Sequence, residues 1–340
     1  MINLLDLHLP LLWFAIIGLI LLFYVVLDGF DLGVGILALL AARDQQYSST
    51  AARSLGSVWE ANESWLVILG GALFGAFPPA YAIVLHALYI PITAMLAGLI
   101  LRGVAFGFLD HAANKRPWNL AFATGSLLAA AAQGIALGGL IQGMAVRGQR
   151  FVGTIWDWLS PFSVLVAVGV VAGYSLLGAT YLIMKTEGDL QRKGARHARV
   201  AALCMLAAAI GVTLWTPFLH RYIADKWLSP QTPYWLAPLP LLASFCFVML
   251  WRALKLPQER SPFFWSLGIF VASFGGLAAS LYPYLIPQSL TVTEAASSRG
   301  TLMFMLIGIG TLLPVIWVYN GYQYAVFGGK VRGRGKTDSA

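Results

Sequence analysis

The sequence predicts an all-α polytopic membrane protein with about nine transmembrane helices. The chain has 340 residues, of which 59% are hydrophobic and only 11% are charged, and its mean hydropathy is +0.75. A soluble domain carries roughly 25% charged residues, so lipid must act as the solvent for much of this chain. The apolar residues also fall into runs of about 20 residues or more, which is the length that crosses the hydrocarbon core of a bilayer.

Nine apolar stretches are the candidate spans. They lie at about 9–42, 58–77, 79–101, 119–145, 161–184, 200–220, 234–251, 263–286 and 302–328. The first is longer than one perpendicular crossing needs, so we expect it to tilt, kink or project beyond the membrane. Small residues four apart, at Gly103/Gly107 and Gly134/Gly138, favour close packing between helices. Residues 1–328 are predicted to form a single transmembrane domain, followed by a basic cytoplasmic tail at 329–340.

The Lys and Arg residues gather in alternate connections between these spans. Of the 22, 17 lie in the odd-numbered connections and the C-terminal tail, with Arg102 assigned to the connection after the third span. No basic residue is expected within the membrane. The positive-inside rule then places the N-terminus outside and the C-terminus in the cytoplasm. This topology explains the net charge of +8, and we exclude nucleic acid as a partner.

Four of the fourteen acidic residues lie within or at the edge of apolar runs, namely Asp28, Asp31, Glu60 and Glu63. A carboxylate exposed to lipid costs about 3 kcal/mol or more, so such groups usually face the interior of a bundle. Each pair has i, i+3 spacing, which places both members on one helix face. The predicted topology brings both pairs toward the cytoplasmic side, where they can meet in an antiparallel hairpin.

The surroundings of the second pair, Trp59, Asn62 and Trp65, leave two interpretations open. In one, the acids form a hydrated proton path from the cytoplasm, because buried carboxylates can relay protons. In the other, they are solvated acids that cap helix ends, with the two tryptophans in an interfacial aromatic belt.

The histidines are sparse. They are His8, His86, His111, His197 and His220, and only His86 falls well inside a predicted span. Haem ligation within a bundle commonly needs two axial side chains, and no pair stands out. The sequence therefore predicts no haem, other metal site, cofactor site or catalytic residue in this chain alone.

The sequence contains two long motifs, LDGFDLGVGIL at 27–37 and WEANESWLVILGGALFGAFP at 59–78. They resemble subunit II of the cytochrome bd-type quinol oxidases, including the cyanide-insensitive branch. Weaker matches follow in order along nearly the whole chain: LRGVAFGF around Arg102, LIQG around Gln142, GATYLIMKTEGDL from Gly178, PYLIPQSLTVTEAAS, and YQYAVFGGKV.

The chain departs from the family pattern at two positions. Gly107 stands where many relatives have an acidic residue after RGVAF, so no role of that acid carries over. Glu60 stands where some relatives have Asp, a change that keeps the carboxyl group and alters its reach.

The resemblance implies two four-helix bundles plus one peripheral helix. It also implies a heterodimer with subunit I, which holds haem d, two b-type haems and the quinol-oxidising site. The complex would oxidise quinol and reduce oxygen to water in the bacterial inner membrane. This chain would stabilise subunit I and supply part of a proton path through Asp28, Asp31 and Glu60, with Glu63 beside them. A structural quinone and a small accessory subunit are options that the resemblance leaves open.

Two other functions compete with this one. A proton-coupled secondary transporter also buries acids, but transporters usually repeat such a site in a second half, and here the acids occur in the first two spans only. A purely structural or assembly subunit would differ from the preferred function only in that the acids carry no protons.

Overall fold

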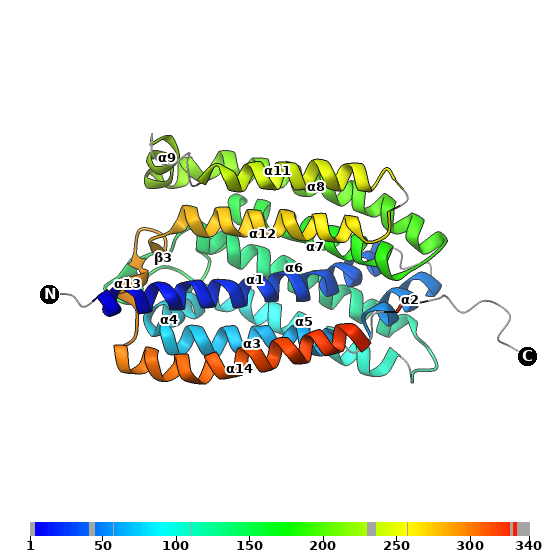
Figure 1. Cartoon of the computed structure of the whole chain (residues 1–340), viewed down its shortest axis with the longest axis horizontal. Helices are drawn as coiled ribbons and strands as arrows, with labels where there is room; N and C mark the ends of the chain where they lie inside the picture. The colour runs from blue at the N-terminus through cyan, green and yellow to red at the C-terminus, as the bar shows by residue number, and fades with distance from the viewer. Residues whose placement is uncertain are drawn as a thin grey trace, which may run out of the picture.

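The structure is a computed structural model, and it describes residues 4–40, 45–56, 58–109, 111–229, 236–256, 258–326 and 329–331. Long helices run side by side along the longest axis of the molecule (Figure 1). The helices of the first half are α1 (Leu4–Leu40), α2 (Gln45–Leu55), α3 (Val58–Ala76), α4 (Pro78–Ala87), α5 (Tyr89–Leu109) and α6 (Arg116–Gln142). Those of the second half are α7 (Pro161–Lys185), α8 (Asp189–Leu219), α9 (Arg221–Leu228), α11 (Pro238–Ala253), α12 (Ser261–Leu281), α13 (Val292–Ala295) and α14 (Arg299–Val326).

The predicted class is confirmed. Within the described residues, seven helices are long and apolar enough to cross a membrane, starting with His8–Leu40 of α1. The shorter apolar helix α11 and the acid-bearing helix α3 match the other two predicted spans, at 234–251 and 58–77. Helices α1, α3, α4–α5 and α6 form one group of four, and α7, α8, α11 and α12 form the other. Helix α14 lies at the edge of the first group, where it packs on α3 and α1.

The predicted third span is two helices, which meet at Leu88. Pro91 has no amide hydrogen to donate to the carbonyl of Ala87, and its ring crowds that carbonyl, so a continuous helix would lose its regular bond there. Helix α4 accordingly ends at Ala87 and α5 begins at Tyr89. The first predicted span is instead one unbroken helix, despite Gly29, Gly33 and Gly35.

Close helix contacts explain why small residues recur. A Cβ atom at Gly33 of α1 would lie 1.8 Å from the carbonyl oxygen of Tyr174 in α7. Cβ atoms at Gly134 and Gly138 of α6 would lie 2.4 Å from the Cα atoms of Ala167 and Ser163 in α7. The packing role predicted for Gly134/Gly138 is thus confirmed, because a larger residue would push the backbones apart.

Short elements connect the spans. Helix α2 and the C-terminal ends of α5, α7 and α14 lie at one end of the molecule (Figure 1). The opposite end holds α9, α13 and two antiparallel hairpins, β1 (Val146–Arg147) with β2 (Arg150–Phe151) and β3 (Tyr284–Ile286) with β4 (Leu290–Thr291). The connections predicted to be cytoplasmic therefore share one end. Of the predicted tail, residues 329–331 are described and 332–340 lie outside the described residues.

Candidate functional site

Arg102 lies inside the first group of helices, which corrects the expectation that no basic residue is within the membrane. It belongs to α5, seven residues before the helix ends at Leu109, or about 10 Å along the axis. Its side chain is completely buried. The predicted third span ended at residue 101, because hydropathy alone stops a span at the first charge. The remaining basic residues keep the bias on which the topology rests.

Arg102 is buried because two carboxylates surround it. Its Nη2 atom lies 2.8 Å from Oδ1 of Asp28 in α1 and 2.6 Å from Oε1 of Glu63 in α3. A buried guanidinium is tolerated only when it is paired in this way. One cation therefore joins α1, α3 and α5, and the two predicted acid pairs do meet, through a residue that neither pair contains.

Asp31 makes a separate polar contact about one turn further along α1 from Asp28. Its Oδ2 atom accepts a hydrogen bond of 2.9 Å from Nδ2 of Asn62, and both residues are buried. The same Nδ2 donates to the carbonyl of Leu27 at 3.3 Å. The hydroxyl of Tyr324 in α14 donates to Oδ1 of Asn62 at 2.9 Å. The peripheral helix thus completes the surroundings of Asp31.

The cluster of Asp28, Asp31, Glu63 and Arg102 holds more negative than positive groups. Two carboxylates contact the guanidinium, and the third, Asp31, is buried about one turn along α1 from Asp28. Two uncompensated negative charges would be costly in such a medium, which favours the binding of a proton by the cluster. Among the described residues, Oδ1 of Asp31 and Nε and Nη1 of Arg102 have no hydrogen-bond partner. Buried polar atoms of this kind usually bind ordered water.

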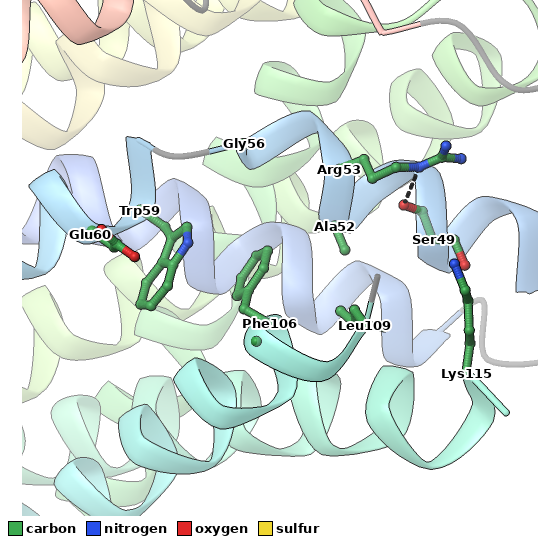
Figure 2. A pocket seen from close by; sticks show the side chains of 10 residues that line it. Ser49, Ala52, Arg53, Gly56, Trp59, Glu60, Phe106, Leu109 and Lys115 are labelled. Atoms are coloured by element: carbon green, nitrogen blue, oxygen red, sulfur yellow. Dashed lines mark hydrogen bonds between the residues drawn. The ribbon is translucent and has the colours of Figure 1, made fainter. Parts of the chain in front are cut away.

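Glu60 does not join this cluster. It is exposed at the start of α3 and lines a pocket between α2, α3 and the end of α5 (Figure 2). Glu63, one turn further along α3, has a side chain that is 28% exposed, and Asp28 is only 1% exposed. The acids therefore form a gradient of burial from the surface pocket to the interior.

The two tryptophans of the motif have different positions. Trp59 stacks on Phe106 of α5, with ring centroids 5.2 Å apart, and lines the same pocket as Glu60. Trp65 is buried and stacks on Phe23 of α1 at 4.9 Å. The interfacial interpretation therefore fits Trp59 and Glu60, but it does not fit Trp65, Asp28 or Asp31.

A second buried polar group continues from the cluster. Nε2 of Gln133 in α6 donates to the hydroxyl of Tyr24 at 2.7 Å, and the hydroxyl of Tyr174 in α7 donates to Oε1 of Gln133 at 2.7 Å. Tyr24 lies one turn before Asp28 on α1. Because Tyr24 accepts from Gln133, its own hydroxyl hydrogen is free to point toward Asp28.

The histidines do not converge on a common point. Both ring nitrogens of His220 are engaged, Nε2 with the carbonyl of Ile141 at 2.6 Å and Nδ1 with Gln288 at 3.1 Å. His86 is exposed and packs against Phe151. In the part of the chain that the structure describes, no group of three or more His, Cys, Asp and Glu residues could hold a metal ion.

Arg102 and Tyr324 are the site residues that the sequence did not predict. Both lie in segments that the family resemblance includes, LRGVAFGF and YQYAVFGGKV. Arg102 could have been identified from the sequence by reasoning that buried acids need a positively charged partner. Tyr324 gave no chemical signal, because a tyrosine near the end of a span is typical of the membrane interface.

Comparison with known proteins identifies the family of the chain. Residues 9–327 match the family described as cytochrome bd terminal oxidase subunit II. The chain is 26% identical over 356 residues to cytochrome bd-I ubiquinol oxidase subunit 2 of Escherichia coli (strain K12), with 94% of each chain covered. It is 28% identical over 330 residues to cytochrome bd ubiquinol oxidase subunit 2 of Bacillus subtilis (strain 168), covering 93% of this chain and 95% of that one.

A solved structure shares the fold. The bd oxidase from Geobacillus thermodenitrificans contains a chain that matches 94% of this one with a TM-score of 0.78 at 20% identity, and 98% of that chain is covered. The family match extends over the charged cluster, the pocket and all the long helices. This chain belongs to the cytochrome bd terminal oxidase subunit II family.

Proposed function

We propose that this chain carries protons from the cytoplasm toward the oxygen-reducing centre of a bd-type quinol oxidase and stabilises the haem-bearing subunit I as its heterodimer partner. The names of the relatives, subunit 2 of ubiquinol oxidases, support the reaction, in which quinol is oxidised and oxygen is reduced to water. Haem d and the two b-type haems would supply the electron transfer from within subunit I. No residue of this chain would act directly on quinol or oxygen.

The observation that carries the proton role is the charge imbalance of the buried cluster. A group of three carboxylates and one arginine favours the binding of a proton, and it would exchange that proton with a neighbouring donor. A purely structural ion pair would need only one carboxylate for Arg102.

The burial gradient gives the path an order. Glu60 would take up a proton at the surface pocket and pass it, through water, to Glu63 one helical turn away. Glu63 and Asp28 contact the same Nη2 atom of Arg102, so they are close enough to exchange a proton through a water molecule. Tyr24 and Asp31 lie next to Asp28 along α1 and could receive it.

This proposal places the chain in the bacterial inner membrane as a multi-pass protein, with its N-terminus outside and its C-terminus in the cytoplasm. The bias of Lys and Arg supports that orientation, and it puts the Glu60 pocket on the cytoplasmic side. The family match favours an oxidase subunit over the proton-coupled transporter, which rested on the buried acids alone.

Purification through a tag on this chain tests the proposal. The preparation should contain a haem-bearing partner, a haem d band in the reduced-minus-oxidised spectrum, and quinol-driven oxygen uptake. A haem-free preparation without a partner, from membranes that do oxidise quinol through haem d, would contradict the oxidase assignment.

Two substitutions then test the proton role. Glu60→Gln and Asp28→Asn should each lower turnover roughly tenfold or more, because each removes a proton carrier, while haem content stays at the wild-type level. Asp225→Asn, which changes an exposed acid at the opposite end of the molecule, is the matched control and should leave turnover unchanged. Wild-type turnover in both test variants would instead support a purely structural subunit.

A further inference from the structure

A chain of hydrogen bonds leads from α7 to the buried cluster. The hydroxyl of Tyr174 donates to Oε1 of Gln133 at 2.7 Å, and Nε2 of Gln133 donates to the hydroxyl of Tyr24 at 2.7 Å. Tyr24 lies one turn before Asp28 on α1, and its hydroxyl is next to the Asp28 carboxylate. Three helices, α7, α6 and α1, therefore contribute to the surroundings of this acid.

The orientation of the Gln133 amide fixes the direction of the chain. Because the amide nitrogen faces Tyr24, the Tyr24 hydroxyl accepts on that side and keeps its own hydrogen for another partner. Oδ2 of Asp28 has no hydrogen-bond partner among the described residues, so it can accept that hydrogen. The reverse orientation of the amide would draw the Tyr24 hydrogen to Gln133 and turn a lone pair of the hydroxyl toward the carboxylate.

The far end of the chain is fixed by packing. The ring of Tyr174 lies against α1 at Gly29, where a Cβ atom would be 2.7 Å from Cε1 of the ring. Phe270 of α12 stacks on the same ring, with the centroids 6.2 Å apart. Tyr174 is buried, and its hydroxyl hydrogen is directed at the amide oxygen of Gln133. This bond keeps the amide nitrogen of Gln133 toward Tyr24.

Such a chain does not carry a proton away from Asp28. A hydroxyl relays a proton only when it can pass its own hydrogen to a further acceptor. On its far side Tyr24 meets an N–H donor of Gln133, and Gln133 in turn accepts from Tyr174. The hydrogens of the chain all point toward the acid, so a proton on Asp28 has no acceptor along it.

Asp31 differs from Asp28 in the donors around it. Asp28 lies 2.8 Å from the cation of Arg102 and has Tyr24 as a further donor. Asp31 receives a neutral donor, Nδ2 of Asn62 at 2.9 Å, and its Oδ1 atom has no partner among the described residues. Donors stabilise the charged form of a carboxyl group, whereas an oxygen without a donor can carry a hydrogen. Asp28 therefore suits the carboxylate, and Asp31 suits the protonated acid.

We propose that Tyr24 and Gln133 are positioning residues, which keep Asp28 as the carboxylate of the resting cluster and direct its proton transfer to Asp31. Asp31 holds the proton of the resting cluster, and after it releases that proton, Asp28 supplies the next one. The inference rests on the proposed proton role and selects one of the two residues that could receive a proton from Asp28.

Infrared spectra of the resting complex, purified through this chain, test the proposal without turnover. A protonated carboxyl group has a C=O stretch that is separate from the bands of carboxylates and amides. Variant-minus-wild-type spectra therefore show which acid holds a proton. Asp31→Asn should remove one such band from the wild-type spectrum, whereas Asp28→Asn should leave that band in place.

Loss of the oriented donor should move a proton onto Asp28. Tyr24→Phe should add a protonated-carboxyl band, and combining it with Asp28→Asn should remove that band again. Gln133→Leu should add the same band at lower intensity, because nothing then fixes the direction of the Tyr24 hydroxyl. Tyr222→Phe removes a hydroxyl at the opposite end of the molecule and is the matched control, whose spectrum should equal that of the wild type.

The proposal is overturned if Asp28→Asn removes the wild-type band, or if Tyr24→Phe or Gln133→Leu leaves the spectrum unchanged in complexes of normal haem content. The two aspartate variants decide the resting state even if a variant of the chain does not assemble. Proton uptake at the wild-type rate in Asp28→Asn would contradict the proposed function and leave the infrared result standing, so the two failures are distinguishable.

Discussion

Arg102 determines the chemistry of the buried cluster. Burying a guanidinium within a membrane span costs free energy, and the ion pairs with Asp28 and Glu63 at 2.8 and 2.6 Å are what make its burial tolerable. The same cation holds two acids close together, so their protons can be exchanged over a short distance. Asn62 has the corresponding role for Asp31, because it fixes one carboxylate oxygen and leaves the other without a partner among the described residues.

The first prediction concerns this residue. Arg102→Gln should destabilise the folded complex by about 3–5 kcal/mol, because Asp28 and Glu63 would stay buried without their cation. Thermal unfolding of the purified complex, together with its haem content, measures the effect. Adding Asp28→Asn and Glu63→Gln should restore much of the stability. If Arg102→Gln alone and the triple variant are equally stable, Arg102 does not stabilise the complex through its ion pairs with Asp28 and Glu63.

At the scale of elements, the approach of α1 to α7 holds the two groups of helices together. Gly33 contacts the backbone of Tyr174 and Gly178 so closely that no side chain fits between them. Tyr174 also bonds to Gln133, so α1, α6 and α7 are joined at this level. A shift of α1 would therefore move Asp28 and Asp31 away from Arg102 and Asn62.

Gly33→Ala should consequently impair assembly. A methyl group 1.8 Å from the Tyr174 carbonyl forces the backbones apart, and overpacking of this kind costs about 1–3 kcal/mol or more. Gly70→Ala in α3, where a Cβ atom has open space, is the matched control. The yield and melting temperature of the complex report the difference, and a normal yield of the Gly33 variant would contradict the packing described here.

Residues 329–331, which follow α14 in the chain, are connected to the second group of helices by ion pairs and a backbone hydrogen bond. Nζ of Lys330 lies 2.8 Å from Glu259 and 3.4 Å from Glu187, and the amide of Val331 donates to the carbonyl of Lys185 at 2.8 Å. Hydrogen bonds from Lys330 and Gln191 hold the pKa of Glu259 below its usual value of 4.5. The stabilising contact is therefore present above that value and is lost as the pH falls through the lowered pKa.

Lys330→Gln should accordingly speed hydrogen exchange at the Val331 amide near neutral pH, with little effect on turnover. Arg334→Gln removes the same charge from the tail and serves as the control. Equal exchange rates in the wild type and the Lys330 variant would mean that the backbone bond to Lys185 holds the segment without the ion pairs.

At the scale of the whole molecule, much of the fold was predictable and part of the site was not. Hydropathy located the spans because lipid imposes one requirement on every crossing helix. Hydropathy ended the third span too early, just before Arg102. The acids that neutralise this charge are distant in the sequence, so a short hydropathy window cannot distinguish Arg102 from a charged residue in a loop. The break at Leu88 was missed although Pro91 signals it, because the surrounding run is uniformly apolar.

The acids could be selected as candidates from the sequence because carboxylates are rare in membrane spans, yet the partners of Asp28, Asp31 and Glu63 come from other helices. Arg102, Tyr324 and Gln133 meet the first two helices only after α5, α14 and α6 have packed. Spacing within one segment cannot reveal such contacts. For the same reason, the separation of Glu60 from the other three acids became visible only in three dimensions.

The central claim is that protons reach the oxidase through this chain, and proton uptake during a single turnover tests it most directly. The reduced complex in liposomes is mixed with oxygen, and a pH dye follows uptake from the side that holds the Glu60 pocket. Asp28→Asn should slow uptake roughly tenfold or more while the haem spectrum and the initial oxygen reaction stay at their wild-type rates. Uptake at the wild-type rate in this variant and in Glu60→Gln would contradict the claim.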